Sequence, residues 1–299
     1  MIEEFRYPRL GPGMMWERTQ ELIEEKGGSV QMRSEVVKVH HEGNRVTSID
    51  VRKWSADGED LGVETVEGDH FVNSMAMRDM VHAFDNPPQE VIDAANKLRY
   101  RDFLIVTLVL NAADPFPDNW IYIHSPDVRV GRIQNFRAWS EEMLPDKNTA
   151  SIGMEYFCNI GDDLWEMNQE ELQALASKEL AQLGLATEDM VIGSAIIRQP
   201  KAYPVYDGEY MEALDTIGEW VRTFENFQTV GRNGLHRYNN QDHSMLSAMY
   251  AARNILGGSY DVWNVNVERS YHEKMEVEDE AEERPATVRH SSDLQEQAS

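Results

Sequence analysis

The chain has 299 residues, 53 acidic and 28 basic, and a formal net charge of -25. A field of this sign repels polynucleotides and anionic membranes, and no basic patch offsets it, so we expect no nucleic-acid partner. The longest apolar run, residues 103–110, is too short to span a bilayer, and the start lacks a secretory pattern. The composition therefore predicts a globular, cytoplasmic protein with no membrane span.

Cysteine and histidine usage predicts neither a disulfide nor a metal site. Cys158 is the only cysteine, and we expect it to be a small buried strand residue rather than a nucleophile. His40 and His41 are successive strand residues, which point to opposite faces and so do not share a metal.

The first third of the chain reads as one helix followed by short strands. Pro12 opens the helix, and Gly27-Gly28 ends it. Alternating apolar residues then predict strands around residues 36–39 and 46–54, joined by a turn at Gly43, and two more at 64–66 and 70–74. A helix follows, and its apolar face, formed by Met77, Met80, Val81 and Phe84, is expected to pack in the core.

The middle of the chain is rich in strands. Residues 103–110 are apolar apart from one threonine and predict a central strand covered on both faces. Further strands are expected at 120–124, 128–136, 150–157 and 190–197. Asn168 and Glu171 form a capping box for a helix that stops at Gly184.

Residues 198–206 gather two basic groups and two tyrosines beside prolines. Arg198, Tyr203 and Tyr206 are candidates for binding an anionic or sugar-like substrate. A rigid connecting loop with half-buried tyrosines explains the same residues equally well, and the pattern leaves both interpretations open.

A glycine-bearing polar loop follows a predicted strand at residues 224–230. It begins at Gly231, and Met245, Met249, Ala252 and Ile255 then recur at helical spacing up to Gly257. Free N–H groups at a helix N-terminus, reached through a glycine loop, form a ready site for phosphate or another electron-rich group. The alternative is that Asp242 or Ser244 simply caps a core helix.

The loop resembles the flavin-contacting motif of the amine oxidase / protoporphyrinogen oxidase superfamily of FAD-dependent oxidoreductases. It is especially similar to the branch related to UDP-galactopyranose mutase, in which a Gly-Arg pair precedes Tyr, Asp and a helix over the flavin. The segment around Glu35–Val39 resembles a strand of the same superfamily that passes the adenine end of FAD. The matching positions are Val36, Gly231, Arg232, Tyr238, Asn240, Asp242, Ser244 and Met245.

This resemblance implies an α/β (α+β) fold, namely the C-terminal portion of a two-domain flavoenzyme, with FAD as cofactor and a mixed-sheet substrate domain. Residues 1–76 would form part of the FAD-binding domain, 77–224 the substrate domain, 225–272 the return to the FAD domain, and 273–299 a disordered acidic tail. The expected reaction is hydride transfer from a small-molecule substrate to flavin. A mutase-like sugar isomerase and a non-catalytic subunit are the alternatives.

The G-x-G-x-x-G turn that receives the FAD pyrophosphate in this superfamily does not occur in the sequence. Gly11-Pro12-Gly13 does not qualify, because proline fills its middle and no strand precedes it. The resemblance therefore implies a partner chain or a missing N-terminal segment that supplies this turn.

Overall fold

The computed structural model of the protein describes residues 6–266, so the tail predicted for residues 273–299 lies outside the described part of the chain. The described residues form two compact units. Unit 1 contains residues 33–99 and 206–266, and unit 2 contains residues 6–32 and 100–205. Unit 1 thus includes residues 77–99 and 206–224, which the resemblance assigns to the substrate domain. Unit 2 includes residues 6–32, which the resemblance assigns to the FAD-binding domain.

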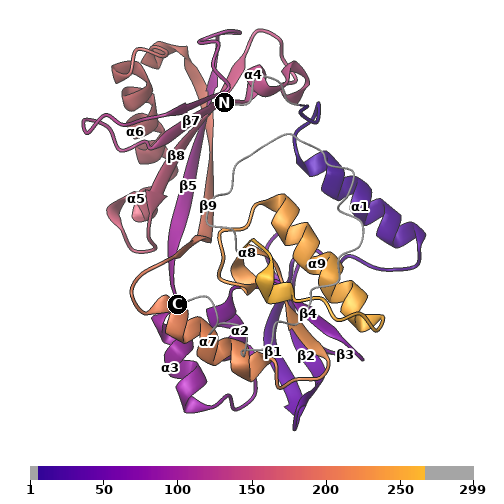
Figure 1. The fold of residues 1–299 in the computed structure, drawn as a ribbon. Coiled ribbons are helices and arrows are strands. Elements are labelled where there is room, and N and C mark those ends of the chain that lie inside the picture. Colours follow the sequence, from indigo (N-terminus) through magenta and orange to yellow (C-terminus); the bar gives the residue numbers. More distant parts are fainter. Residues whose placement is uncertain (1–5, 267–299) are drawn as a thin grey trace, which may run out of the picture. The chain divides into compact units, whose positions relative to one another are not determined.

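One sheet of unit 1 is an antiparallel meander of β1 (Ser34–Glu42), β2 (Arg45–Trp54) and β3 (Asp60–Glu67), visible in Figure 1. Gly43 turns β1 into β2 at a φ of 59°, which glycine adopts without strain. Irregularities in register follow Val36 and His40 on β1. Every residue of β3 is exposed, so this edge strand adds little to the core.

The core of unit 1 is built around Phe84. Its ring lies 4.8 to 5.1 Å, between centroids, from the rings of Trp220, Phe224 and Phe227. The helices of this part of unit 1 are α2 (Met77–Ala83), α3 (Gln89–Lys97) and α7 (Tyr210–Val221), and α3 packs on both of the others. Since Met77, Met80, Val81 and Phe84 are all buried, the predicted core-facing helix is confirmed.

A second sheet of unit 1 is a parallel pair, β4 (Phe71–Asn73) and β10 (Phe227–Thr229). Asn226 connects this pair to the meander, because its side chain accepts from the Val46 N–H and donates to the Val46 and Asp69 carbonyls. After β10 come the short helix α8 (Gly231–Gly234), the long helix α9 (Gln241–Ile255) and the 3-10 turn η3 (Val262–Asn264).

Helix α9 does not bury the apolar positions that predict it. Ser247 and Ala251 are fully buried against β10, where Gln228 Nε2 donates to the Ala251 carbonyl. Three exposed residues, Met245, Met249 and Leu256, lie on the opposite side at spacings of four and seven residues. The helix itself is confirmed, but within residues 6–266 its apolar stripe faces outward.

Unit 2 is built on a five-stranded sheet in the order β6-β7-β8-β5-β9. The predicted central strand is confirmed as β5 (Arg99–Leu110), whose alternate residues from Leu104 to Leu110 are fully buried, while those between them are half-buried. The pairings of β6 with β7, β7 with β8 and β8 with β5 are antiparallel. The other strands are β6 (Trp120–Tyr122), β7 (Arg132–Asn135), β8 (Ala150–Cys158) and β9 (Val191–Val205).

Helix α6 (Gln169–Gln182) covers one face of this sheet (Figure 1). Its predicted capping box between Asn168 and Glu171 is confirmed. Buried Glu179 ties α6 to the sheet by accepting from the Tyr156 hydroxyl and two backbone N–H groups, and burial raises the pKa of Tyr156. Cys158 is buried at the end of β8, as predicted. The smaller helices are α1 (Gly13–Glu25), α4 (Phe136–Trp139), α5 (Asp163–Glu166), η1 (Glu141–Met143) and η2 (Glu188–Met190).

None of the helices described within residues 6–266 is both long and apolar enough to cross a membrane.

A histidine and two carboxylates join β1 and β2 to the segment that follows α2. His40 Nε2 lies 3.0 Å from Asp50 Oδ2, and His40 Nδ1 lies 2.6 Å from Asp85 Oδ2. These two hydrogen bonds raise the pKa of His40. Hydrogen bonds from Thr65 and then His40 lower the pKa of Asp50, and those from Lys38 and then His40 lower the pKa of Asp85.

Replacing His40 with glutamine is expected to destabilise the protein more in mild acid than in alkali. The charged imidazole contributes fully below its unfolded pKa of about 6.5, and this contribution is lost as the pH rises through the raised folded value. The two carboxylates lose their contribution only as the pH falls through their lowered values, below about 4. Urea unfolding of wild type and variant at about pH 5.5 and about pH 9 measures the difference. An equal loss at both pH values would contradict the prediction.

Candidate functional site

The carboxyl ends of β4 and β10 meet at one edge of their parallel pair. Asn73 Nδ2, at the end of β4, donates to Thr229 Oγ1 at the end of β10 over 3.0 Å. Thr229 Oγ1 donates in turn to the Gly234 carbonyl in α8 over 2.6 Å. In open α/β sheets, ligands bind outside the carboxyl ends of the strands, particularly where neighbouring strands lead to opposite sides. This edge is therefore the candidate ligand site of unit 1.

Gly231 gives the loop after β10 its conformation. Its φ is +79°, in the left-handed region that glycine adopts most readily, and its N–H donates to Ser247 Oγ of α9 over 3.0 Å. A Cβ built on Gly231 would meet no heavy atom within 4 Å. The backbone is thus fixed to α9 on one side and has open space where a side chain would begin.

The Arg232 side chain links the start of the polar loop to Tyr238 and Asn239 near its end. Its Nε donates to the Asn239 carbonyl over 2.8 Å, and its guanidinium carbon lies 4.6 Å from the centre of the Tyr238 ring. The Tyr238 N–H donates to the Tyr206 hydroxyl over 2.6 Å. The pKa of Tyr206 is raised, because the effect of burial outweighs the lowering effect of the hydrogen bond from the Tyr238 N–H. The Gly-Arg pair and Tyr238, which the sequence motif singles out, are therefore brought together.

The N-terminus of α9 follows directly. Asn240 is its N-cap residue, so neither Asp242 nor Ser244 occupies that position, and the Asn240 side chain makes no capping hydrogen bond. Asp242 lies in the first turn with an exposed side chain, 3.2 Å from His243 Nδ1. Ser244 is half-buried and Met245 exposed. An uncapped first turn leaves backbone donors directed out of the helix end.

Val36 lies elsewhere in unit 1. It is a half-buried residue of β1, opposite Val51 of β2 and beside a register irregularity. It therefore belongs to the meander and not to the parallel pair that carries Gly231.

The three predicted substrate-side residues have different surroundings. Arg198 of β9 donates to the carbonyls of Trp165 and Met167 over 3.0 and 2.5 Å. Tyr203, on the same strand, packs on Phe103 and Phe157. Tyr206 belongs to unit 1, where it holds the polar loop through Tyr238.

Sequence reasoning missed a charged cluster on the face of the unit 2 sheet that α6 does not cover. Glu155 of β8 is 1% exposed and accepts from Arg132 Nε and Gln134 Nε2 of β7. The Arg132 guanidinium carbon lies 4.9 Å from the centre of the Trp120 ring. Arg132 Nη2 also donates a hydrogen bond to the Tyr203 hydroxyl. The available signal was a single acidic residue within the apolar strand 150–157.

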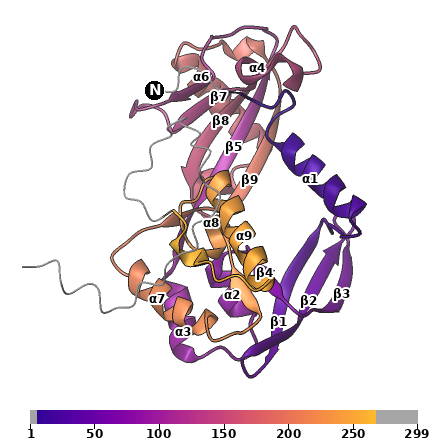
Figure 2. The ribbon, with the colours of Figure 1, turned by 45° about the vertical axis from the view of Figure 1, so that its right-hand side comes forward.

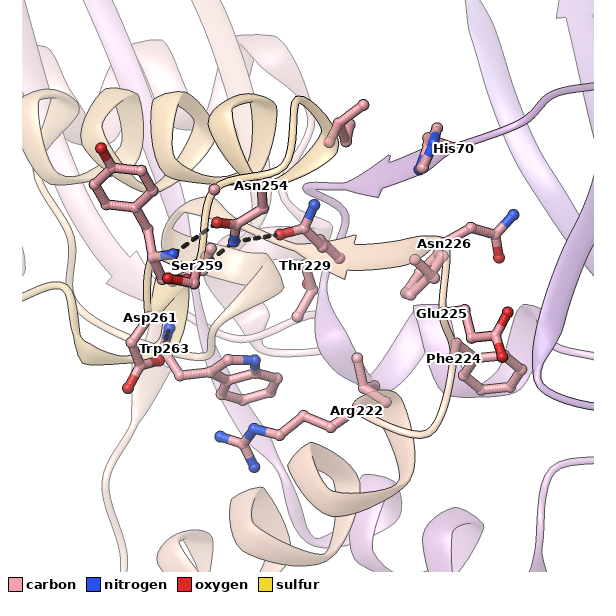
Figure 3. Close-up of a pocket in the computed structure, with 17 residues that line it drawn as sticks. His70, Arg222, Phe224, Glu225, Asn226, Thr229, Asn254, Ser259, Asp261 and Trp263 are labelled. Atoms are coloured by element: carbon pink, nitrogen blue, oxygen red, sulfur yellow. Dashed lines mark hydrogen bonds between the residues drawn. The ribbon is translucent and has the colours of Figure 1, made fainter. Parts of the chain in front are cut away.

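A cavity of about 400 Å³ lies beside β10 in unit 1. Residues that line it are drawn in Figure 3. The Arg222 side chain reaches under the Trp263 ring, with 4.8 Å between its guanidinium carbon and the ring centre, and Glu225 and Phe224 lie on the opposite side. Asn254 donates to Gln228 and to the Tyr260 carbonyl. Residues 231–245 do not line this cavity, so it is distinct from the polar loop.

In the part of the chain that the structure describes, no three His, Cys, Asp or Glu side chains are grouped so as to hold a metal ion.

No protein-family model matches the sequence, and no curated protein matches it. The structure is similar to that of a reduced UDP-galactopyranose mutase, with a TM-score of 0.71 and 16% identity over 86% of this chain and 54% of that chain. It is also similar to wild-type putrescine oxidase bound to putrescine, with a TM-score of 0.55 and 14% identity over 82% of this chain and 53% of that chain. The chain thus shares their fold and spans about half the length of each.

Proposed function

We propose that this chain forms part of a FAD-dependent oxidoreductase that transfers a hydride from a small-molecule substrate to flavin. The observation that carries the proposal is the edge where β4 and β10 end, with the open backbone at Gly231 and the uncapped start of α9. The similar fold of putrescine oxidase supports the same reaction class. The residues proposed to border FAD are Val36, Gly231, Arg232, Asn240, Asp242, Ser244 and Met245.

These residues fit part of a flavin. The absence of a side chain at Gly231 leaves space for close approach, and the first turn of α9 presents backbone donors to an electron-rich edge. The exposed carboxylate of Asp242 suits hydroxyl donors of a ribityl or ribose group. Arg232 is held on Tyr238 and would add positive charge beside the loop.

The chemistry itself would come from FAD, as hydride acceptor in oxidation or, when reduced, as a nucleophile at a sugar carbon in mutase chemistry. We propose that Tyr203 and Tyr206 bind the substrate. Arg198 is the weaker candidate for this role, because its guanidinium donates to two main-chain carbonyls. The protein groups would orient the substrate and set the charge around it.

A mutase-like sugar isomerase is the second candidate, favoured by the TM-score of 0.71 to UDP-galactopyranose mutase. A non-catalytic subunit that needs a partner chain or N-terminal segment for FAD is the third. Because the chain spans 54% of that mutase, the groups for the rest of the cofactor would come from outside residues 1–299.

The first test is flavin retention. We expect the purified chain, mixed with FAD and freed of excess, to keep a visible flavin spectrum. Gly231→Ala should weaken retention about tenfold, because its Cβ would enter the open space proposed for the flavin. The strain of a Cβ at positive φ, about 1–2 kcal/mol, lowers the stability of the fold with or without flavin. A folded chain that retains no flavin would contradict the idea that these residues suffice for a site.

Gly193→Ala in unit 2 is the matched control, because its Cβ would meet nothing within 4 Å and its φ is not positive. Chain that retains flavin is then tested with amines and with UDP-galactopyranose. Loss of the oxidised flavin spectrum with an amine supports the oxidoreductase, and isomerisation of the sugar only after chemical reduction supports the mutase.

A further inference from the structure

Unit 2 contains a cavity of about 660 Å³ that the proposed function does not use. It is lined by the proline loop, residues 114–117 after β5, and by Asn135 and residues 137–141 in and around α4. Figures 1 and 2 both show α4 at the end of the sheet where β5 and β7 end and β8 begins. The residues proposed to border FAD or the substrate all lie within residues 6–266, and none of them lines this cavity. Its volume suits a small organic ligand.

The buried amide of Asn135 joins the two lining segments. Its Nδ2 donates to the Phe116 carbonyl over 2.9 Å, and its Oδ1 accepts from the Ala138 N–H over 3.3 Å. Asn119, just after the proline loop, donates from Nδ2 to the Ala138 carbonyl over 2.9 Å. The two prolines restrict the backbone of the loop further. The walls of the cavity are therefore held in place by unit 2 itself.

Arg137 supplies positive charge to this cavity. Its side chain is 10% exposed, so its guanidinium has lost most of its water. Nη1 donates to the Thr149 carbonyl over a long 3.4 Å, and Nε lies 3.7 Å from Oδ1 of Asp114, whose side chain is 90% exposed. A guanidinium has five N–H donors, and buried charges are normally paired. Arg132 has the buried carboxylate of Glu155 against it, whereas no carboxylate within residues 6–266 lies closer to Arg137 than that of Asp114.

The other lining residues restrict the charge and the body of a ligand. Phe116 is 8% exposed, and Trp139 and the two prolines add further apolar surface. Arginine pairs with a planar carboxylate through two parallel hydrogen bonds. Asp114 and Glu141 also line the cavity, and their two negative charges disfavour a doubly charged anion. A singly charged carboxylate with a flat apolar body meets all of these conditions.

We propose that this cavity binds a small aromatic monocarboxylate. The carboxylate pairs with the Arg137 guanidinium, and the ring packs on Phe116 and Trp139. A desolvated cation without a close partner lowers stability, and the bound carboxylate reverses this loss. The inference goes beyond the proposed function, because it assigns a second ligand to unit 2 and involves no flavin.

Isothermal titration calorimetry of the full chain with benzoate and with phenylacetate tests the proposal. We expect saturable binding of a carboxylate at one site per chain. Benzamide, which has the ring without the charge, should not bind, and doubly charged phenyl phosphate should bind more weakly. Arg137→Met should weaken binding about thirtyfold or more, because it removes one partner of a desolvated charge pair. Arg137→Lys should restore only part of the affinity, since an ammonium group does not pair bidentately.

Arg101→Met is the matched control, because Arg101 is an exposed residue of β5 that does not line the cavity. It should bind the carboxylate as wild type does. Urea unfolding without ligand separates binding from a structural role. Since Arg137 lacks a close carboxylate within residues 6–266, Arg137→Met should unfold at the same urea concentration as wild type, or at a higher one.

The absence of binding of both carboxylates would overturn the proposal, and so would equal binding of benzamide. Unchanged affinity in Arg137→Met, together with a lower unfolding midpoint, would give Arg137 a structural role and overturn it as well. The titration does not depend on flavin. A chain that retains flavin but binds neither carboxylate overturns only this inference, and carboxylate binding without flavin retention overturns only the proposed function.

Discussion

Glu155→Ala is expected to lower the free energy of unfolding of unit 2 by about 3–5 kcal/mol. Glu155 is 1% exposed, and the Arg132 side chain is 14% exposed. Removing the carboxylate would leave the Arg132 guanidinium among the Trp120, Phe103 and Phe157 rings without its counter-charge. Breaking a buried ion pair costs more than the pair contributes, because a desolvated charge remains. Urea unfolding followed by circular dichroism measures the loss.

Two variants separate this explanation from a general effect of losing an ion pair. The double variant Arg132→Met, Glu155→Leu should recover most of the stability, because it leaves no unpaired charge in the sheet. Asp163→Ala removes the partner of Arg129 in an exposed ion pair with contacts of 2.6 and 2.7 Å, and should lower the stability far less than Glu155→Ala does. A double variant as unstable as Glu155→Ala would contradict the argument.

Gly234→Ala is expected to cost about 2–3 kcal/mol and to abolish flavin retention. The new Cβ would lie 2.7 Å from Thr229 Oγ1 and 3.2 Å from the Asn73 carbonyl oxygen. Thr229 Oγ1 cannot move aside without losing its hydrogen bonds to Asn73 Nδ2 and the Gly234 carbonyl. These bonds hold α8 on the ends of β4 and β10, so the whole loop would shift.

Gly208→Ala is the control for this prediction, because it lies in the same unit, its φ is not positive and its Cβ would meet nothing within 4 Å. It should change stability by no more than about 0.5 kcal/mol. If Gly234→Ala unfolds at the same urea concentration as Gly208→Ala, the close packing of α8 does not stabilise unit 1.

The sequence by itself determined those elements that depend on residues a few positions apart in the chain. The capping box of Asn168 and Glu171 starts α6, and the apolar run 103–110 forms the central strand β5. Gly231 stands where the chain takes a positive φ between β10 and α9. Such features follow from backbone sterics, hydrogen-bond geometry and side-chain periodicity, which act between near neighbours in the chain.

Tertiary structure decided what depends on residues far apart in the chain. Asn73 meets Thr229 across 156 positions, and only this pairing brings two carboxyl strand ends to one edge. It also decided that the buried carboxylate Glu155 pairs with Arg132, and that α9 packs its small residues inward and exposes its methionines. Periodicity shows that a helix has an apolar stripe, but which face is buried depends on the surface that the rest of the fold offers to it.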